Sequence, residues 1–246
     1  AQGARVIAID DADTPELREL TEPLQQRGAE CHLGNAGALS ENFDLGVISP
    51  GVPLENPIVT SLRERGIPIW SELELGWRES GCLAIGITGT NGKTTTTELV
   101  VAILGQNQRR TLAAGNIGTP VCAVAGQSRE LDVLTLEVSS FQLETIDAFR
   151  PNIAVLLNLA PDHLDRHGSM ENYIRAKARL FENQKHFDRA IIQWDAWREL
   201  RRLGIDVRSK VTTFSATELE ADLHLDRSFL ISRVPGWTGP ILDLDE

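Results

Sequence analysis

Cysteine is scarce in this chain of 246 residues, and the few cysteines present form no pattern. Cys31, Cys82 and Cys122 lie far apart, are odd in number and include no C-x-x-C pair. The chain also has no pair of histidines in the H-E-x-x-H spacing of a zinc-binding helix. We therefore expect three buried free thiols and no zinc site.

Basic residues are too few to balance the acidic ones. The chain has 24 Lys and Arg against 35 Asp and Glu, which gives a net charge of −11 and a pI near 5.0. A nucleic-acid partner requires a basic surface, so the charge argues against one. The chain also lacks a run of eighteen apolar residues and an N-terminal signal pattern. We expect a cytoplasmic protein that does not insert into a membrane.

Strand and helix patterns alternate along the first part of the chain. Strand-like runs cover RVIAI (5–9), AECHL (29–33), LGVIS (45–49) and IPIW (67–70). Helix starts are indicated at Thr14-Pro15, at Asn56-Pro57 and at Ser71, where Glu74 completes a capping-box pattern. Repeated strand–helix units predict a parallel sheet with helices on its faces.

A second series of such units follows Glu79-Ser80-Gly81, so we predict a first domain of residues 1–80 and a second of residues 81–246. The second contains the strands DVLTLE (132–137), NIAVLLN (152–158) and AIIQW (190–194), and an amphipathic helix from about Ser169 to Gln184. VTTFS (211–215), LHLDRSFLISR (223–233) and GPILDLD (239–245) predict a small antiparallel patch. The predicted class is α/β, with a mostly parallel sheet.

The most informative segment is ITGTNGKTTTT, residues 87–97, which lies between the apolar run CLAIG and the helical stretch ELVVAIL. A strand, a Gly-rich turn ending in Lys-Thr and a helix form a phosphate-binding loop. Successive backbone N–H groups would face the phosphates, Lys93 would reach the β- and γ-phosphates, and Thr94 would offer its hydroxyl to Mg²⁺. Ile87 stands where the usual G-x-x-x-x-G-K-[ST] spacing has Gly. We expect ATP or GTP binding.

Polar residues also cluster after two later strands, where a doubly wound sheet has its active site. Glu137 ends DVLTLE and is placed to hold Mg²⁺, although a solvated loop carboxylate at a helix start is an equal alternative. The run DHLDRH (162–167) follows Asn158 and carries too many charges and imidazoles for a simple surface turn. Asn116, in the turn AAGNIGTP, could bind a ligand or simply form the turn.

Four segments together resemble the central domain of the Mur ligases. They are TGTNGKTTTT, GNIGTP, LEVSSFQLE and NLAPDHLDRHGSMENYIRAKARLF, in this order, over about residues 82–184. The Phe-Gln-Leu-Glu continuation is similar to the branch of the family that joins D-glutamate to UDP-N-acetylmuramoyl-L-alanine. The first eighty residues are similar to the UDP-binding domain, with weaker motifs.

The resemblance implies an ATP-dependent ligase of peptidoglycan precursor synthesis that works through an acyl phosphate. It implies ATP contacts at Thr90, Asn91, Gly92, Lys93, Thr94, Thr95 and Thr96. It implies substrate contacts at Asp10, Ser49, Pro50, Gly51, Asn116, Ser139, Gln142 and His163. Of two Mg²⁺ ions, one would be held by Thr94 and Glu137, and the second by His163 and by Lys177 after carbamylation by CO₂. The catalytic set would be Lys93, Glu137, His163 and Lys177, in a monomer whose partners are small molecules.

Two departures from the family pattern lead us to expect a fragment that is inactive alone. The chain opens at what resembles the second strand of the UDP-binding domain. It stops before the L-x-G-x-H-N-x-x-N segment and before the C-terminal domain.

Three alternatives remain open. Another Mur ligase or a cyanophycin-synthetase-like enzyme shares the TGTNGKTTTT loop. Folylpolyglutamate synthase fits less well because its loop reads Gly-Lys-Gly-Ser. A non-catalytic nucleotide-binding module would not need the second-metal residues His163 and Lys177.

Overall fold

The computed structural model describes residues 3–34 and 41–245. The chain divides into two compact units, one formed by Ala1–Gly46 with Val52–Ile69 and the other by Val47–Gly51 with Trp70–Glu246. Each is described by itself below.

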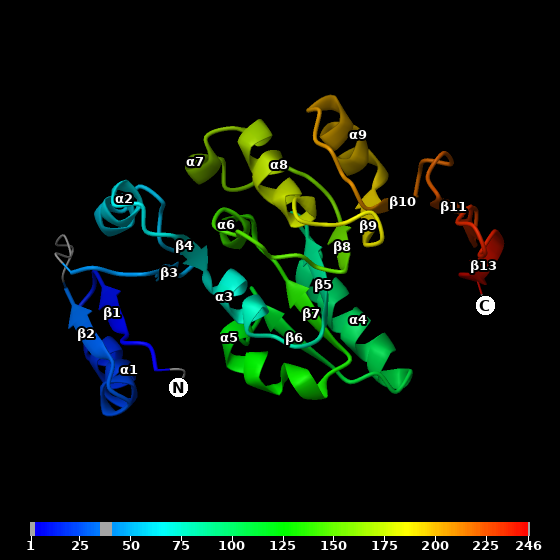
Figure 1. Cartoon of the computed structure of the whole chain (residues 1–246). Coiled ribbons are helices and arrows are strands. Elements are labelled where there is room, and N and C mark those ends of the chain that lie inside the picture. The colour runs from blue at the N-terminus through cyan, green and yellow to red at the C-terminus, as the bar shows by residue number, and fades with distance from the viewer. Residues whose placement is uncertain (1–2, 35–40, 246) are drawn as a thin grey trace. The chain divides into compact units, whose positions relative to one another are not determined.

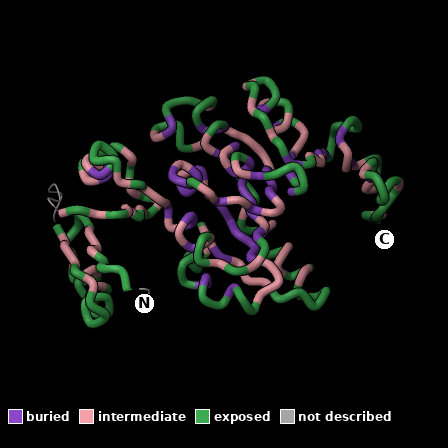
Figure 2. Tube along the Cα trace, viewed as in Figure 1, coloured by how far each residue is buried: buried purple, intermediate pink, exposed green. Residues whose placement is uncertain are grey.

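The first unit is built around one β–α–β repeat. Strands β1 (Ile7–Asp10) and β2 (Glu30–Leu33) pair in parallel, joined by helix α1 (Pro15–Gln26). As predicted, Thr14 caps α1 by accepting the N–H of Leu17, and Asn56 caps α2 (Pro57–Glu64). Val59 and Leu62 are the only buried residues in the described part of this unit, which Figure 2 shows as mostly exposed. Its hydrophobic core is therefore small.

The described part of the second unit contains a sheet of nine strands in the order β13-β12-β11-β10-β9-β8-β5-β7-β6 (Figure 1). The strands are β5 (Leu83–Thr88), β6 (Thr111–Gly115), β7 (Val133–Glu137), β8 (Ile153–Leu156), β9 (Arg189–Gln193), β10 (Lys210–Ser215), β11 (Leu223–Asp226), β12 (Phe229–Ser232) and β13 (Gly239–Asp243). Strands β6 to β11 run parallel, whereas β11, β12 and β13 pair in antiparallel fashion. A separate two-stranded sheet joins β3 (Gly46–Ile48) and β4 (Ile69–Ser71).

The mostly parallel α/β class is confirmed, but the antiparallel patch is smaller than predicted. The segment VTTFS lies in β10, which pairs in parallel with β9 along five positions. The unpredicted helix α9 (Trp194–Arg202) supplies the crossover between these two strands. The antiparallel part therefore starts only at β11.

The remaining helices of the second unit lie between its strands. They are α3 (Glu72–Arg78), α4 (Lys93–Gln106), α5 (Val121–Val124), η1 (Ala125–Glu130), α6 (Ser140–Leu143), α7 (Leu164–His167), α8 (Met170–Ala178) and η2 (Arg179–Phe181). The single helix predicted for residues 169–184 is wrong in its second half, because the α-helix ends at Ala178 and tightens into a 3₁₀ turn. In that turn Leu180 and Phe181 are buried, and Arg179 donates to the carbonyls of Leu143 and Ile146. These contacts with distant segments accompany the end of the α-helix at Ala178.

The order of the strands places a switch point at β5. From β5 the chain passes through α4 to β6 and returns to β7 on one side, and then continues to β8 and β9 on the other. Ligands of open α/β sheets bind outside the carboxyl ends of the strands at such a point. The loop that follows β5 is therefore where the topology itself predicts a ligand.

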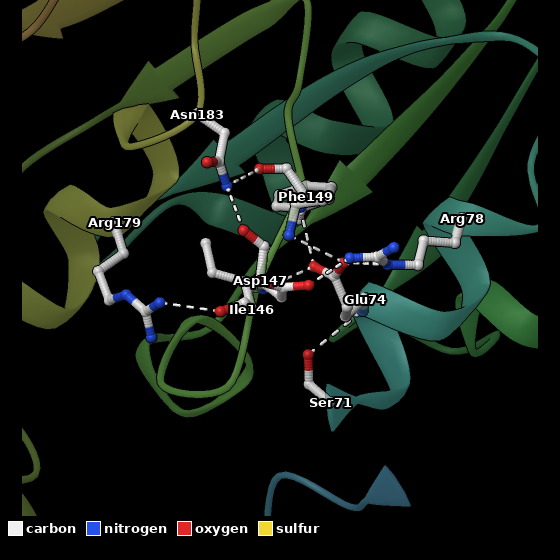
Figure 3. A network of polar contacts seen from close by, with 9 residues as sticks. Ser71, Glu74, Arg78, Ile146, Asp147, Phe149, Arg179 and Asn183 are labelled. Carbon is white, nitrogen blue, oxygen red and sulfur yellow. Dashed lines mark hydrogen bonds and ion pairs between the residues drawn. The ribbon is translucent and has the colours of Figure 1, made fainter. Parts of the chain in front are cut away.

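Within the second unit, one buried carboxylate joins helix α3 to the loop of residues 147–149. Glu74 is fully buried and accepts the N–H groups of Asp147 (2.9 Å), Ala148 (3.0 Å) and Phe149 (2.8 Å) (Figure 3). Arg78, one turn later, donates to the same carboxylate and also pairs with Asp147. Only half of the predicted capping box forms, because the Glu74 side chain is taken by this loop while Ser71 still caps the helix.

Helix α3 also contacts α5 closely at Gly76. A Cβ atom at Gly76 would lie 2.6 Å from the backbone nitrogen of Cys122. Through these contacts α3 packs within the second compact unit, which includes Trp70–Glu246. The domains 1–80 and 81–246 stay a prediction.

Candidate functional site

The loop after β5 has the predicted phosphate-binding form. Gly92 adopts φ = 80° at the N-cap of α4, a conformation that favours glycine. The Nζ atom of Lys93 donates to the carbonyls of Gly89 (3.1 Å) and Thr90 (2.8 Å), so the ammonium lies over the loop. The strand, loop and helix predicted from ITGTNGKTTTT are therefore confirmed.

Asn158 lies two residues after β8 and braces this loop, and the sequence assigned it no role. Its Oδ1 atom accepts the N–H groups of Thr90 (3.0 Å) and Asn91 (2.9 Å), and its Nδ2 donates to the carbonyl of Asn91 (3.0 Å). Two of the loop N–H groups predicted to face the phosphates are thus already bonded. The first-turn N–H groups of α4, which have no intrahelical acceptor, are the donors for an anion.

Glu137 and Thr94 form an oxygen pair at the start of α4. The Thr94 hydroxyl donates to Oε2 of Glu137 (2.7 Å), and Asn116 Nδ2 donates to Oε1 (2.7 Å). Glu137 is buried at the end of β7, so it is not the solvated loop carboxylate of the alternative interpretation. Hard oxygen donors beside a phosphate-binding loop fit Mg²⁺.

Gly115 makes this arrangement possible. It has φ = 103°, and a Cβ atom there would lie 2.3 Å from the carbonyl oxygen of Glu137. The backbone N–H of Asn116 donates to that same oxygen (2.9 Å). Strand β6 therefore approaches Glu137 more closely than any side chain would permit.

Lys177 is buried beside the loop. It is 2% exposed, and its Nζ donates to the carbonyl of Gly89 (2.9 Å), which also accepts from Lys93. Burial, with the charge of Lys93 acting in the same direction, lowers the pKa of Lys177 to about 7. Lys177 is therefore not a solvated lysine on the surface of its helix.

Tyr173 lies one helical turn before Lys177, in the segment NLAPDHLDRHGSMENYIRAKARLF, and the sequence assigned it no role. Its hydroxyl is 3.0 Å from Thr90 Oγ1, and Lys177 Nζ lies 4.6 Å from the centre of its ring. The spacing of four residues on one helix was the signal that could have identified it.

His163 begins α7 with φ = 50°. Its side chain is about half exposed, its Nε2 lies 3.5 Å from a carboxylate oxygen of Asp162, and its ring packs on Phe141 with centroids 4.9 Å apart. The imidazole is thus accessible to a ligand. Its role as a metal ligand stays a prediction.

Ser139 and Gln142 form hydrogen bonds with each other. Ser139 accepts the N–H of Gln142 (3.2 Å), and Gln142 Oε1 accepts the N–H of Ser139 (3.0 Å) in a full capping box at α6. Gln142 is buried. The structure shows a capping role for this pair, and their predicted substrate contacts remain untested.

The residues predicted to contact the uridine diphosphate group lie after two strands. Asp10 ends β1 and accepts the N–H of Ala12 (2.9 Å). The turn Ser49–Gly51 follows β3, and the carbonyl of Pro50 accepts from Arg166 (2.8 Å). Each stays a predicted contact.

The cysteines are free, as expected, but the predicted burial is wrong. Cys31 and Cys82 are half-buried, and Cys122 is exposed. Burial of the sulfur and the nearby Glu72 carboxylate raise the pKa of Cys122 to about 12. The raised pKa favours the protonated thiol near neutrality.

His167 provides a pH-dependent contribution to stability. Burial lowers its pKa below the ordinary 6.5, against an opposing effect of Glu144. The unfolded chain therefore binds this proton more readily, so the free energy of unfolding should fall as the pH drops below 6.5. We expect His167→Asn to flatten this dependence in urea titrations between neutral and mildly acidic pH. An unchanged slope would contradict it.

Among residues 3–34 and 41–245, no three His, Cys, Asp or Glu side chains come together as a metal cluster. Thr94 and Glu137 fit one Mg²⁺ as they stand. The amine of Lys177 donates and cannot ligate a cation, so a second metal would require its conversion to an anionic carbamate.

Comparison with known proteins agrees with this geometry. The sequence profile of the Mur ligase middle domain matches residues 87–232. The chain belongs to the Mur ligase family. The matched residues run from β5, before the nucleotide loop, through Glu137, His163 and Lys177 to β12.

This Mur ligase chain is similar to curated proteins named UDP-N-acetylmuramoylalanine–D-glutamate ligase. It is 46% identical to the one from Koribacter versatilis over 79% of this chain and 43% of that protein. It is 41% identical to the one from Acidobacterium capsulatum over 100% of this chain and 54% of that protein. The chain thus spans about half the length of these relatives.

Solved structures share the fold at lower identity. A UDP-N-acetylmuramoyl-L-alanyl-D-glutamate–2,6-diaminopimelate ligase superposes with a TM-score of 0.54 and 23% identity, over 85% of this chain and 55% of that one. MurF from Thermotoga maritima, solved in complex with ADP, gives 0.54 and 17%, over 94% and 53%. No helix in the described ranges is long and apolar enough to span a membrane.

Proposed function

We propose that this chain is the UDP-binding and ATP-binding part of a cytoplasmic UDP-N-acetylmuramoyl-L-alanine:D-glutamate ligase. The observation that supports a phosphoryl-transfer reaction is the contact between Thr94 and Glu137 beside the Lys93 loop. This contact would place an Mg²⁺ site next to a phosphate site. The choice of D-glutamate as substrate rests on two relatives named UDP-N-acetylmuramoylalanine–D-glutamate ligase, which are 41% and 46% identical to this chain.

In this proposal the chain acts by positioning and by neutralising charge. ATP with Mg²⁺ would supply the phosphoryl group that turns the substrate carboxylate into an acylating agent. Lys93 would leave its carbonyl acceptors for the phosphates, while Thr94 and Glu137 hold the cation. Asn116 orients Glu137 through its Nδ2 bond.

Lys177 would act as a carbamate, formed when its neutral amine attacks CO₂ and releases a proton. Three observations support this: the amine is buried, its pKa is lowered to about 7, and it lies beside the loop at the Gly89 carbonyl. The carbamate and His163 would provide donors for a second Mg²⁺.

The carbamate can be tested on the 246-residue chain itself. We expect a carbamate resonance in ¹³C NMR spectra recorded with ¹³C-bicarbonate, absent from Lys177→Arg. Lys185→Arg is the matched control, because Lys185 is exposed and follows soon after Lys177 in the chain. A resonance that persists in Lys177→Arg would refute the assignment.

The reaction itself is tested by phosphate release from Mg·ATP with UDP-N-acetylmuramoyl-L-alanine. A protein that contains this chain and has the full length of these relatives should release phosphate with D-glutamate, and not with L-alanine, L-lysine or diaminopimelate. We expect the 246-residue chain alone to bind Mg·ATP without turnover. Release with a different amino acid would move the protein to another branch of the family.

A further inference from the structure

His167 lies at the centre of a group of aromatic rings, and the proposed reaction gives it no role. Its side chain is almost fully buried, and its Nε2 lies 3.0 Å from the hydroxyl of Ser140. Its ring stacks on Phe141, with centroids 5.3 Å apart and planes at 16°. On another side it packs on Tyr173, with centroids 5.3 Å apart and planes at 60°. It thus contacts two rings that come from different helices.

Phe141 connects His167 to one predicted metal ligand. The Phe141 ring packs on His163, and the guanidinium of Arg166 lies 4.0 Å from its centre. Arg166 is itself held by Oε2 of Glu144 (3.0 Å). The His163 side chain is about half exposed, and its contact with Phe141 joins its ring to His167 through one aromatic side chain.

Tyr173 connects His167 to the other predicted ligand. The Tyr173 ring faces the Nζ atom of Lys177, and its hydroxyl is bonded to Thr90 in the nucleotide loop. Tyr173 itself is fully buried, so its position depends on the side chains packed around it.

We propose that His167 is a positioning residue that sets the orientation of His163 and Lys177 together. The proposal rests on the proposed function, in which these two side chains hold the second Mg²⁺. The contacts of Nε2 with Ser140 and of Nδ1 with Glu144 Oε1 (3.5 Å) fix the rotation of the imidazole, and the packed ring then holds Phe141 and Tyr173 in place. Residues that orient metal ligands commonly change metal affinity by about ten- to a hundredfold when they are replaced.

The test uses two substitutions that separate the ring from its hydrogen bond. His167→Asn keeps a polar group near Ser140 and removes the ring, whereas His167→Phe keeps the ring and removes the hydrogen bond. His186→Asn is the control, because His186 is exposed on the loop before β9. All variants are made in the 246-residue chain.

Two measurements are made on each variant. The first, without metal, is the nuclear Overhauser effect between the rings of Phe141 and His163. The second is Mn²⁺ affinity measured by EPR with ADP and bicarbonate present, where Mn²⁺ stands in for Mg²⁺. We expect His167→Asn to lose the ring contact and to weaken the additional Mn²⁺ site about tenfold. His167→Phe should weaken it about fivefold, the effect of losing one neutral hydrogen bond, and His186→Asn should match the wild type.

The outcomes distinguish the two proposals. If a folded His167→Asn keeps both the ring contact and the Mn²⁺ affinity, the positioning role is overturned. If His167→Asn does not fold, an unchanged His167→Phe overturns it. If the wild type binds no additional Mn²⁺ but His167→Asn still loses the ring contact, the positioning role stands and the proposed second metal fails.

Discussion

Replacement of Glu74 by alanine is expected to lower the free energy of unfolding of the second unit by about 3–5 kcal/mol, the range for removing one partner of a buried ion pair. Glu74 is fully buried and accepts three consecutive N–H groups, those of residues 147–149. Alanine would leave these three buried or partly buried donors without their acceptor, and Arg78 would keep its ion pair with Asp147. Urea unfolding followed by circular dichroism measures the loss.

The chain supplies a matched control for this experiment. Glu171 and Arg175 form an ion pair with the same spacing of four residues, but both side chains are about half exposed. Exposed pairs of this kind contribute about 0.3–0.5 kcal/mol, so Glu171→Ala should change stability little. Similar losses in the two variants would show that burial of the Glu74 carboxylate is not what matters.

Replacement of Gly115 by alanine is expected to lower stability by at least about 2 kcal/mol and Mg²⁺-dependent nucleotide affinity by at least about tenfold. Part of the loss is backbone strain, which is about 1–3 kcal/mol for a side chain held at positive φ. The rest comes from the contact of the new Cβ with the Glu137 carbonyl, at 2.3 Å. Relief of that contact must move β6 or β7, and Glu137 with it. Calorimetric titration with ADP, with and without Mg²⁺, measures the effect on binding.

Substitution of Gly118 distinguishes the effect of the close contact with Glu137 from the effect of backbone strain. It lies in the same turn with φ = 55°, and a Cβ atom there would meet nothing within 4 Å. Gly118→Ala should therefore reduce stability modestly and leave the effect of Mg²⁺ on ADP binding unchanged. If both variants lose Mg²⁺ dependence equally, the close approach of Gly115 to Glu137 is not what positions the carboxylate.

The nucleotide loop could be predicted from sequence because its geometry is local. Gly92 in a left-handed conformation, Lys93 and the helix start lie within a few residues of one another. Strand ends were also predictable, because parallel strands carry their polar residues at one edge of the sheet. Glu137 and Asn158 were placed in this way, although the role of Asn158 as a brace for the loop was not visible.

Two capping-box patterns in this chain have different outcomes. Ser71 and Glu74 have the pattern, yet the Glu74 carboxylate accepts the N–H groups of residues 147–149 instead. Ser139 and Gln142 have the same spacing and do form the full box. The family resemblance had instead implied that Gln142 contacts the substrate. Spacing is the same in both, and the surroundings decide.

The sequence by itself determined the α/β class, the phosphate loop and the edge of the sheet where the site lies, since these depend on periodicity and on residues close together in the chain. Only the tertiary structure decided that Lys177 is a buried amine beside Gly89, that Gly115 must be glycine because of Glu137, and that His167 lies between Phe141 and Tyr173. These facts depend on contacts between segments far apart in the chain, and such contacts set burial, pKa and close approach.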